Sequence, residues 1–248
     1  MNCREIYNVL DEDLPKVRYR TNYMMPKVVK ELMREHKFPA WRICQYTVPE
    51  SDVKYHLCYY AELPINARKP TNMHYCVEEM DEYRYILRAI VGPYVRPDGV
   101  IVDLKQVYYY TYHFLEQYNK RFLNNSALSH DEIACMFVCR NKIITPTRMN
   151  ERINRNYKKH GRFNSHVYEV RDGVCFALTA FQETKDEQGN LIPDDEGTLL
   201  VIYTTFMNED DMSDEQLKAI DEEQEKLFKS INEMNLKYSN LKCFGYEK

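Results

Sequence analysis

The residues best suited to chemistry in this chain are a set of cations that recur with the period of an α-helix. Five of them occur at positions i, i+4, i+7, i+11 and i+14, namely Arg148, Arg152, Arg155, Lys159 and Arg162. This spacing places them on one side of a helix. Residues 145–162, which also include Lys158, carry six Lys or Arg against one acid, in a chain of net charge −4. Such a cationic stripe indicates a binding site for a polyanion.

The elements around this segment follow the order of a winged helix-turn-helix. We expect a long helix over residues 103–124 and a short helix over residues 130–140, which Ser129 and Glu132 begin with a capping box. The basic helix then starts at Thr145-Pro146 and ends at Gly161, and a hairpin turns at Asp172-Gly173. In a winged helix the third helix enters the major groove and the hairpin contacts the backbone as a wing.

The sequence therefore predicts a nucleic-acid-binding protein that uses the basic helix and the adjacent hairpin. Asn154, on the same helix, could read the edge of an adenine. The predicted binding residues are Arg148, Arg152, Arg155, Lys158, Lys159, Arg162 and Asn154. Two features fit the pattern poorly, because the gap over residues 141–144 is long for the turn and the third strand, residues 198–206, is longer than a wing needs.

An alternative without nucleic acid comes from the acidic C-terminal part of the chain. Residues 209–225 carry nine acids and one lysine, which could neutralise the basic stripe within the protein. The helix that follows from Ser213 has apolar residues at alternating spacings of three and four, namely Leu217, Ile220, Leu227, Ile231 and Met234, with Gln224 as one polar position. That pattern is typical of a coiled coil. It predicts either a helix that packs on the body of its own domain, since three heptads are marginal alone, or a homodimer or protein partner, as in an assembly component of a virus or mobile element.

Two histidine–cysteine pairs form a second candidate site. His56 and Cys58, like His74 and Cys76, are two positions apart, so each pair shares one face of a strand. Together they would supply the ligands of a Cys₂His₂ zinc site. However, a simple hairpin about residues 64–72 would pair Cys58 near Glu78 and keep the four ligands apart. We therefore predict no metal, and two ordinary thiols beside two histidines on a polar face.

No local motif identifies an enzyme. The seven glycines form neither a P-loop nor a dinucleotide-binding loop. The nucleophile elbow, the HExxH motif and the kinase signatures are also missing. His130-Asp131-Glu132 has the H-x-E form of zinc deaminases but lacks the P-C-x-x-C that must follow. We expect a binding protein without a cofactor rather than an enzyme, with an enzyme of dispersed residues as the third class.

Tyrosine is unusually common, with 21 residues in the chain. Tyr108, Tyr109, Tyr110 and Tyr112 cluster at the start of the predicted long helix. A helix with successive tyrosines must expose some of them, and tyrosine is common both in protein interfaces and in sites where bases stack. The cluster therefore predicts an interaction surface.

The fold class predicted from these elements is α+β. The N-terminal part contains a short helix over residues 26–36, strands over residues 41–48, 53–63 and 74–77, and a helix over residues 78–91. Prolines and glycines in residues 92–99 indicate a boundary. We expect three parts: an α/β unit (1–98), a helical and β-meander unit resembling a winged helix (99–208), and an acidic amphipathic helix with a tail (209–248).

The sequence also carries expectations about the compartment. The first residues hold several acids and no long apolar run, so we expect no signal peptide, and no segment reaches transmembrane length. Eight cysteines lie outside C-x-x-C pairs, which favours reduced thiols. These observations favour a cytoplasmic protein, in the host cytoplasm if the source is a virus, with no membrane partner.

Overall fold

The computed structural model is mixed α+β, as predicted, and it contains more strand than expected. It describes residues 3–80, 83–95, 101–147, 165–181, 183–185, 191–193 and 198–208. The helices are α1 (Cys3–Leu32), the 3₁₀ helix η1 (Pro64–Arg68), α2 (Tyr112–Tyr118), the π-helical turn η2 (Asn119–Leu123) and α3 (His130–Arg140). The strands are β1 (Ala40–Thr47), β2 (Lys54–Ala61), β3 (Thr71–Met80), β4 (Tyr83–Val95), β5 (Ile101–Thr111), β6 (Ile144–Thr147), β7 (Ser165–Val170), β8 (Gly173–Phe181), β9 (Glu183–Lys185), β10 (Leu191–Pro193) and β11 (Leu199–Met207).

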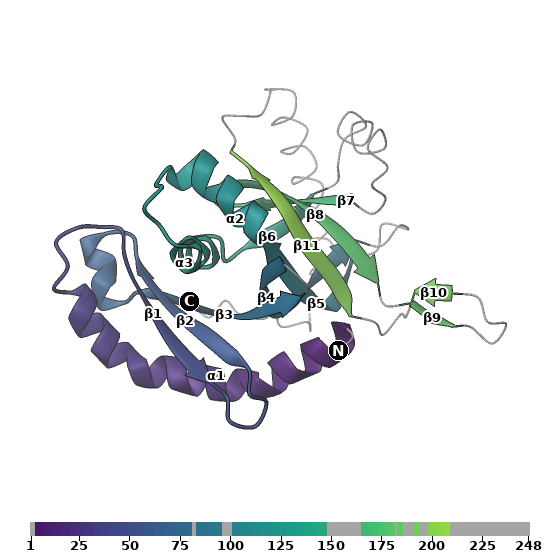
Figure 1. Cartoon of the computed structure of the whole chain (residues 1–248), viewed down its shortest axis with the longest axis horizontal. Helices are drawn as coiled ribbons and strands as arrows, with labels where there is room; N and C mark the ends of the chain where they lie inside the picture. Colours follow the sequence, from purple (N-terminus) through teal and green to yellow (C-terminus); the bar gives the residue numbers. More distant parts are fainter. Residues whose placement is uncertain are drawn as a thin grey trace, which may run out of the picture.

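One sheet organises the described part of the chain. Its nine strands lie in the order β1-β2-β3-β4-β5-β11-β8-β7-β6, and β9 and β10 form a separate pair. Neighbouring strands of the sheet are antiparallel except β5 and β11, which are parallel. Figure 1 shows α1 along one side of the sheet and α2 with α3 on the other. The boundary predicted at residues 92–99 includes the end of β4, and β4 pairs with β5, the strand that follows, in this sheet.

Apolar side chains fill both faces of the sheet. The first core lies under α2 and α3 and is rich in aromatic rings, including a stacked pair, Tyr110 and Tyr203, with ring centroids 4.6 Å apart. The second core lies under α1, where Val17, Val28 and Leu32 are fully buried. Because both faces are covered, inner strands are apolar on both sides, as in β2, where every residue after Lys54 is buried.

The N-terminal helix is longer than predicted. The sequence predicts a helix that begins at Pro26, but α1 begins at Cys3 and passes through Pro15 and Pro26. A proline inside a helix removes one hydrogen bond and bends the axis, and α1 is visibly curved (Figure 1). Burial of its inner face on the sheet offsets that cost, and the Tyr59 hydroxyl donates to the Thr21 carbonyl at 2.8 Å, one turn before Pro26.

Two predicted helices are wrong. Residues 78–80 form the end of β3, residues 83–91 form most of β4, and residues 103–111 of the predicted long helix belong to β5. Only the second half of that prediction is helical, in α2 and η2. Both strands lie inside a sheet that is covered on both faces, so apolar residues follow one another and imitate a helical period. The aromatic and β-branched run from Val107 to Thr111 strongly favours a strand.

The predicted hairpin is confirmed, although its setting is not that of a wing. β7 and β8 pair across Arg171 and Asp172, and Gly173 has a φ of +147°, where glycine is favoured. β7 lies between β8 and β6 within the large sheet. Thr145 and Pro146 belong to β6 rather than to a helix start. A proline is tolerated there because β6 is an edge strand. The winged-helix arrangement is therefore not confirmed.

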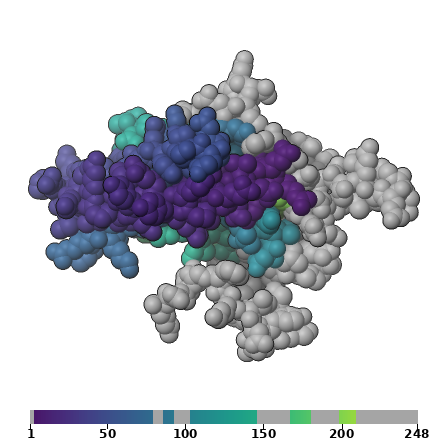
Figure 2. All heavy atoms as spheres, turned by 90° about the horizontal axis from the view of Figure 1, so that it is seen from below, coloured from purple at the N-terminus to yellow at the C-terminus, as the bar shows by residue number. Residues whose placement is uncertain are grey.

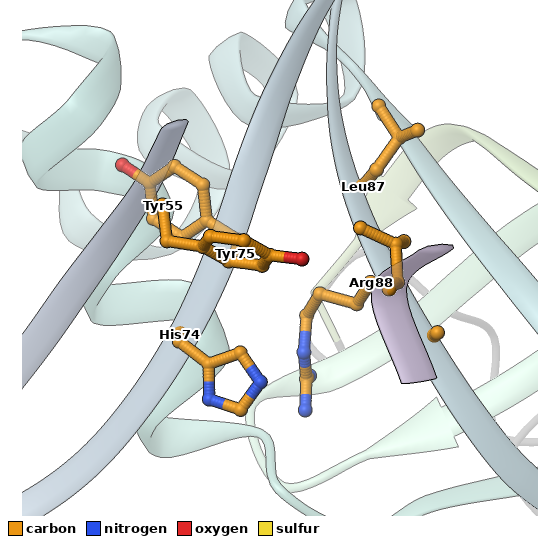
Figure 3. A pocket seen from close by; sticks show the side chains of 7 residues that line it. Tyr55, His74, Tyr75, Leu87 and Arg88 are labelled. Atoms are coloured by element: carbon orange, nitrogen blue, oxygen red, sulfur yellow. The ribbon is translucent and has the colours of Figure 1, made fainter. Parts of the chain in front are cut away.

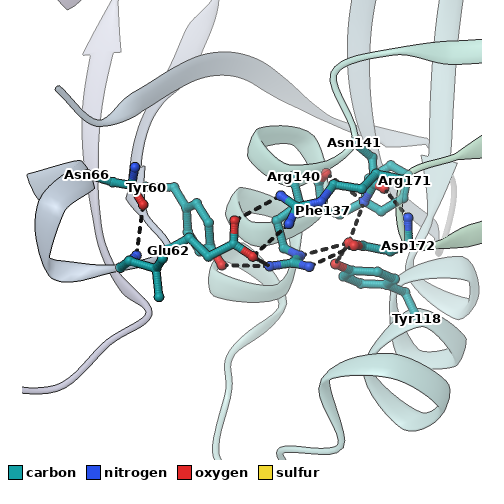
Figure 4. A network of polar contacts seen from close by, with 10 residues as sticks. Tyr60, Glu62, Asn66, Tyr118, Phe137, Arg140, Asn141, Arg171 and Asp172 are labelled. Atoms are coloured by element: carbon teal, nitrogen blue, oxygen red, sulfur yellow. Dashed lines mark hydrogen bonds and ion pairs between the residues drawn. The ribbon is translucent and has the colours of Figure 1, made fainter.

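A buried ion pair ties the hairpin to α3 (Figure 4). The Asp172 side chain is only 2% exposed and accepts two hydrogen bonds from the Arg140 guanidinium, both 2.8 Å long. It also accepts from the Tyr118 hydroxyl at 2.7 Å and from the Asn141 amide at 3.0 Å. Burial alone lowers the pKa of Arg140, but hydrogen bonds to Asp172 and Tyr60 outweigh it and the pKa rises.

The same arginine connects α3 to the strand β2. Its Nη1 donates to the Tyr60 hydroxyl at 3.1 Å and to Glu62 at 2.7 Å, while Arg171 donates to both oxygens of Glu62 at 2.9 Å. Hydrogen bonds from Arg171 and then from Arg140 hold the pKa of Glu62 below its usual range, against the effect of burial. With its donors satisfied on both sides, Arg140 acts as a structural link rather than as a free binding group.

Replacing Asp172 by alanine should therefore lower the free energy of unfolding by about 3–5 kcal/mol, because Arg140 would stay buried without its main counter-charge. Arg171→Ala is the matched control. Arg171 is 54% exposed, and its loss should lower stability by less than about 1 kcal/mol. Urea denaturation of both variants checks the difference, and equal losses would contradict a buried link.

Candidate functional site

The predicted nucleic-acid residues lie outside the described part of the chain. Arg148, Arg152, Arg155, Lys159 and Arg162 follow directly after β6, together with Lys158 and Asn154. The first described element after them is β7. Their chemistry stays a prediction from the sequence.

The predicted coiled-coil positions also lie outside the described residues. Leu217, Ile220, Leu227, Ile231 and Met234 follow the last described residue, Asn208. The same holds for the acidic residues 209–225. Neither a dimer through this segment nor neutralisation of the basic stripe in cis is tested.

The two histidine–cysteine pairs face opposite sides of the sheet. β2 and β3 pair Cys58 with Met73, which lies five positions from Glu78, the partner predicted for Cys58. They also pair His56 with Tyr75. The prediction failed because η1 lies in the connection and β3 already begins at Thr71. Paired residues share a face, so His56 and Cys58 point toward α3, while His74 and Cys76 point toward α1. The four side chains cannot converge on one metal.

The histidines and thiols of these pairs have structural surroundings. His56 is buried rather than on a polar face, with Nδ1 3.6 Å from an Asp131 oxygen and its ring 4.9 Å from that of Tyr75. Burial raises the pKa of Cys58, and raises that of Cys76 to about 12. Thiols with such pKa values are poor nucleophiles at neutral pH. Within the described residues, no group of three or more His, Cys, Asp or Glu could hold a metal ion.

The tyrosine cluster is not an interaction surface. Tyr108, Tyr109 and Tyr110 lie in β5, where successive side chains point to opposite faces. Both faces are covered, so all three are at most 5% exposed. Tyr108 and Tyr110 pack under α2 and α3, and Tyr109 packs under α1. The prediction was wrong because it rested on the helix that the structure replaces with a strand.

The structure instead shows a positively charged face on α1. Residues 16–37 carry seven Lys or Arg against two acids. Six residues occur at positions i, i+3, i+4, i+7, i+11 and i+14, which is the period of one helix face: Lys16, Tyr19, Arg20, Tyr23, Lys27 and Lys30. We call these six residues the α1 outer face. The buried residues Val17, Thr21 and Val28 lie on the opposite side, against the sheet.

Two exposed tyrosines lie among these cations. Tyr19 is 73% exposed and Tyr23 is 64% exposed. The Arg20 guanidinium lies 5.2 Å from the centre of the Tyr23 ring, which limits the movement of both. Figure 2 shows α1, in purple, along the front of the molecule in this view. Flat aromatic rings are therefore presented outward beside positive charge.

Few acids of the described chain counter this charge. Lys16 pairs with Glu50 at 2.9 Å. The two acids at the end of the segment, Glu31 and Glu35, both pair with Arg42 of β1. In the ranges that the structure describes, Lys27 and Lys30 have no carboxylate partner, and both are exposed.

The α1 outer face could have been found from the sequence. Its helical period and its excess of cations match those of residues 145–162. The prediction missed it because the helix was expected to begin at Pro26, so positions before and after Pro26 were never placed on one face.

Comparisons with known proteins give no assignment. No protein-family model matches the chain, and neither a curated protein nor a solved structure is significantly similar to it. Among the described helices, none is long and apolar enough to cross a membrane. Function must be inferred from the chemistry and placement of the side chains.

One half-buried histidine, His74, should make stability depend on pH. Burial, with the charges of Arg88 and Arg18, lowers the pKa of His74 to about 4, against about 6.5 in an unfolded chain. The unfolded state then binds more protons between these values, so stability should fall as the pH drops from about 6.5 to about 4, by about 3 kcal/mol from this residue.

The variant His74→Gln should lose that part of the acid sensitivity. Urea denaturation of wild type and variant across this pH window measures it. His113→Gln removes an exposed imidazole and serves as the control. Parallel pH profiles for wild type and His74→Gln would contradict the expectation.

Proposed function

We propose that this protein binds nucleic acid through the α1 outer face, with a preference for unpaired strands. The observation that carries the proposal is the alternation of exposed tyrosines with cations along one side of a long helix. Proteins that bind single strands combine positive charge, which follows the phosphates, with aromatic rings, on which bases stack. Both components are present on this face.

The extent of the face favours a polymer over a small ligand. From Lys16 to Lys30 it covers fourteen helical steps, or about 21 Å at 1.5 Å per residue. A single phosphate would contact only one or two of its cations. A strand lying along the helix could contact Arg20, Lys27 and Lys30 in turn, with bases against Tyr19 and Tyr23.

The basic segment at residues 145–162 is proposed as a second part of the same function. Its six cations and Asn154 retain the polyanion signature of their sequence. We do not assign it the role of a recognition helix, because the first part of the predicted first helix, residues 103–111, is β5 and the predicted wing is an inner hairpin.

Charge reversal on α1 should weaken binding. In Lys27→Glu with Lys30→Glu, affinity for a single-stranded oligonucleotide at low salt should fall at least tenfold, because two phosphate contacts become repulsive. Fluorescence anisotropy measures the affinity, and wild-type affinity should fall steeply with salt. The double variant Arg68→Glu with Lys69→Glu changes the net charge equally on exposed residues of η1 and its end, and should bind like wild type.

The same assay separates the alternatives. If Arg152→Glu with Arg155→Glu removes binding and the α1 variant does not, the interface lies at residues 145–162 alone. If the wild type does not bind at low salt, the proposed function is wrong. An assembly component would then be expected to respond to Leu227→Asp in its oligomeric state.

The tyrosines should contribute through stacking. In Tyr19→Ala and Tyr23→Ala, affinity for single strands should drop by about 1–3 kcal/mol each, while the salt dependence should stay unchanged because no charge is lost. Tyr46→Phe, which keeps a ring beside Arg20, is the control. Equal loss for single and double strands would contradict a stacking role.

A further inference from the structure

The large sheet divides between β3 and β4. β3 pairs with β2 through residues 71–76, but with β4 only through residues 76–80, and the last pair is Cys76 with Leu87. β4 continues along β5 as far as Val95. Residues 71–75 of β3 and residues 88–95 of β4 therefore diverge. We call the gap at the point of divergence the fissure.

A small cavity lies in the fissure. It is lined by Leu10 of α1 and by residues of β2, β3 and β4, mainly Tyr55, His74, Tyr75, Leu87 and Arg88. Figure 3 shows the His74 ring and the Arg88 guanidinium pointing toward each other across the gap. Its cavity volume is about 20 Å³. That is far below the roughly 300–1,000 Å³ of pockets for larger ligands, so the cavity can hold no more than one small group.

Arg88 gives the cavity its charge. It is half-buried, and among the described residues that line the cavity it alone carries a full charge at neutral pH. No carboxylate of the described chain forms an ion pair with it. The nearby tyrosine hydroxyls are neutral and do not balance this charge: Tyr110 interacts with Arg88 through a hydrogen bond, while Tyr55 donates to Asp13 and Tyr75 donates to Asp131. A partly buried cation of this kind is stabilised by an anion.

His74 adds a neutral hydrogen-bond donor on the opposite wall. Its pKa of about 4 follows from burial first and from the charges of Arg88 and Arg18 next. At neutral pH the imidazole is uncharged and carries one N–H. An anion between His74 and Arg88 would accept from both, with a charge-assisted bond on the arginine side.

We propose that the fissure between β3 and β4 is a binding site for a single oxyanion of the phosphate class, held by Arg88 and His74. This site is separate from the α1 outer face and does not depend on the proposed function. The phosphate could be a free ion or the terminal phosphate of a nucleotide chain. The chemistry of recognition is the same for both.

The test is a titration with inorganic phosphate at constant ionic strength, followed by NMR of the histidine side chains. The His74 signals, assigned by comparison with His74→Gln, should shift and saturate, while those of His113 should not. In Arg88→Gln, the affinity should fall about 10- to 100-fold, since a charged hydrogen-bond donor is lost. Arg68→Gln, which removes an exposed arginine, should leave the affinity unchanged.

The outcomes separate the possibilities without relying on one variant. If Arg88→Gln does not fold, the wild-type His74 signals and the charge-preserving Arg88→Lys still test the site. Wild-type His74 signals that do not shift, or that shift without saturation alongside His113, would overturn the proposal. An oligonucleotide with a 5′-phosphate that displaces phosphate, where its 5′-hydroxyl counterpart does not, would identify a strand end as the source. Saturable binding of free phosphate alone would identify a small ion.

Discussion

The burial of Asp172 is the constraint on which most of the described structure depends. A carboxylate that is 2% exposed must be matched by donors, and these come from α2, α3 and the residue that follows α3. Arg140 then has to lie close to the hairpin between β7 and β8, and its remaining nitrogen, Nη1, donates to Tyr60 of β2. The first and second halves of the sheet are thereby fixed to the same helix. The aromatic core under α2 and α3 fills the space that this link defines.

The outline of the structure could be predicted from local signals in the sequence. The capping box of Ser129 and Glu132, the Asp172-Gly173 turn and the alternation in residues 53–63 each identified an element that is present. The two wrongly predicted helices have one physical origin. A sheet that is covered on both faces removes the polar side of its strands, so β4 and the tyrosine-rich β5 imitated helices. The coverage is a tertiary property, because α1 precedes these strands and α2 with α3 follow them.

The candidate sites show the same contrast between local signals, which the sequence contains, and tertiary placement, which it does not reveal. The spacing of the histidines and cysteines was visible, but their placement on opposite faces required the register of β2 with β3. The fissure could not be predicted, since it arises where β3 follows β2 and leaves β4. The α1 outer face was predictable in principle, because helical period and composition suffice to find it. On α1 the inner side packs on the sheet and is apolar, which leaves the outer side free to be selected for charge.

The parallel pairing of β5 with β11 determines the order in which the sheet can be completed. β11 lies between β5 and β8, yet it follows both in the chain, and residues 112–198 intervene between β5 and β11. During synthesis, the edges of β5 and β8 that face β11 stay unpaired until β11, which ends at residue 207, has left the ribosome. Pairing across such a distance in sequence is slow, and unpaired edges promote association between chains. The sheet is therefore completed only when β11, the last described strand, inserts between β5 and β8. A nascent chain stalled before β11 would expose two strand edges.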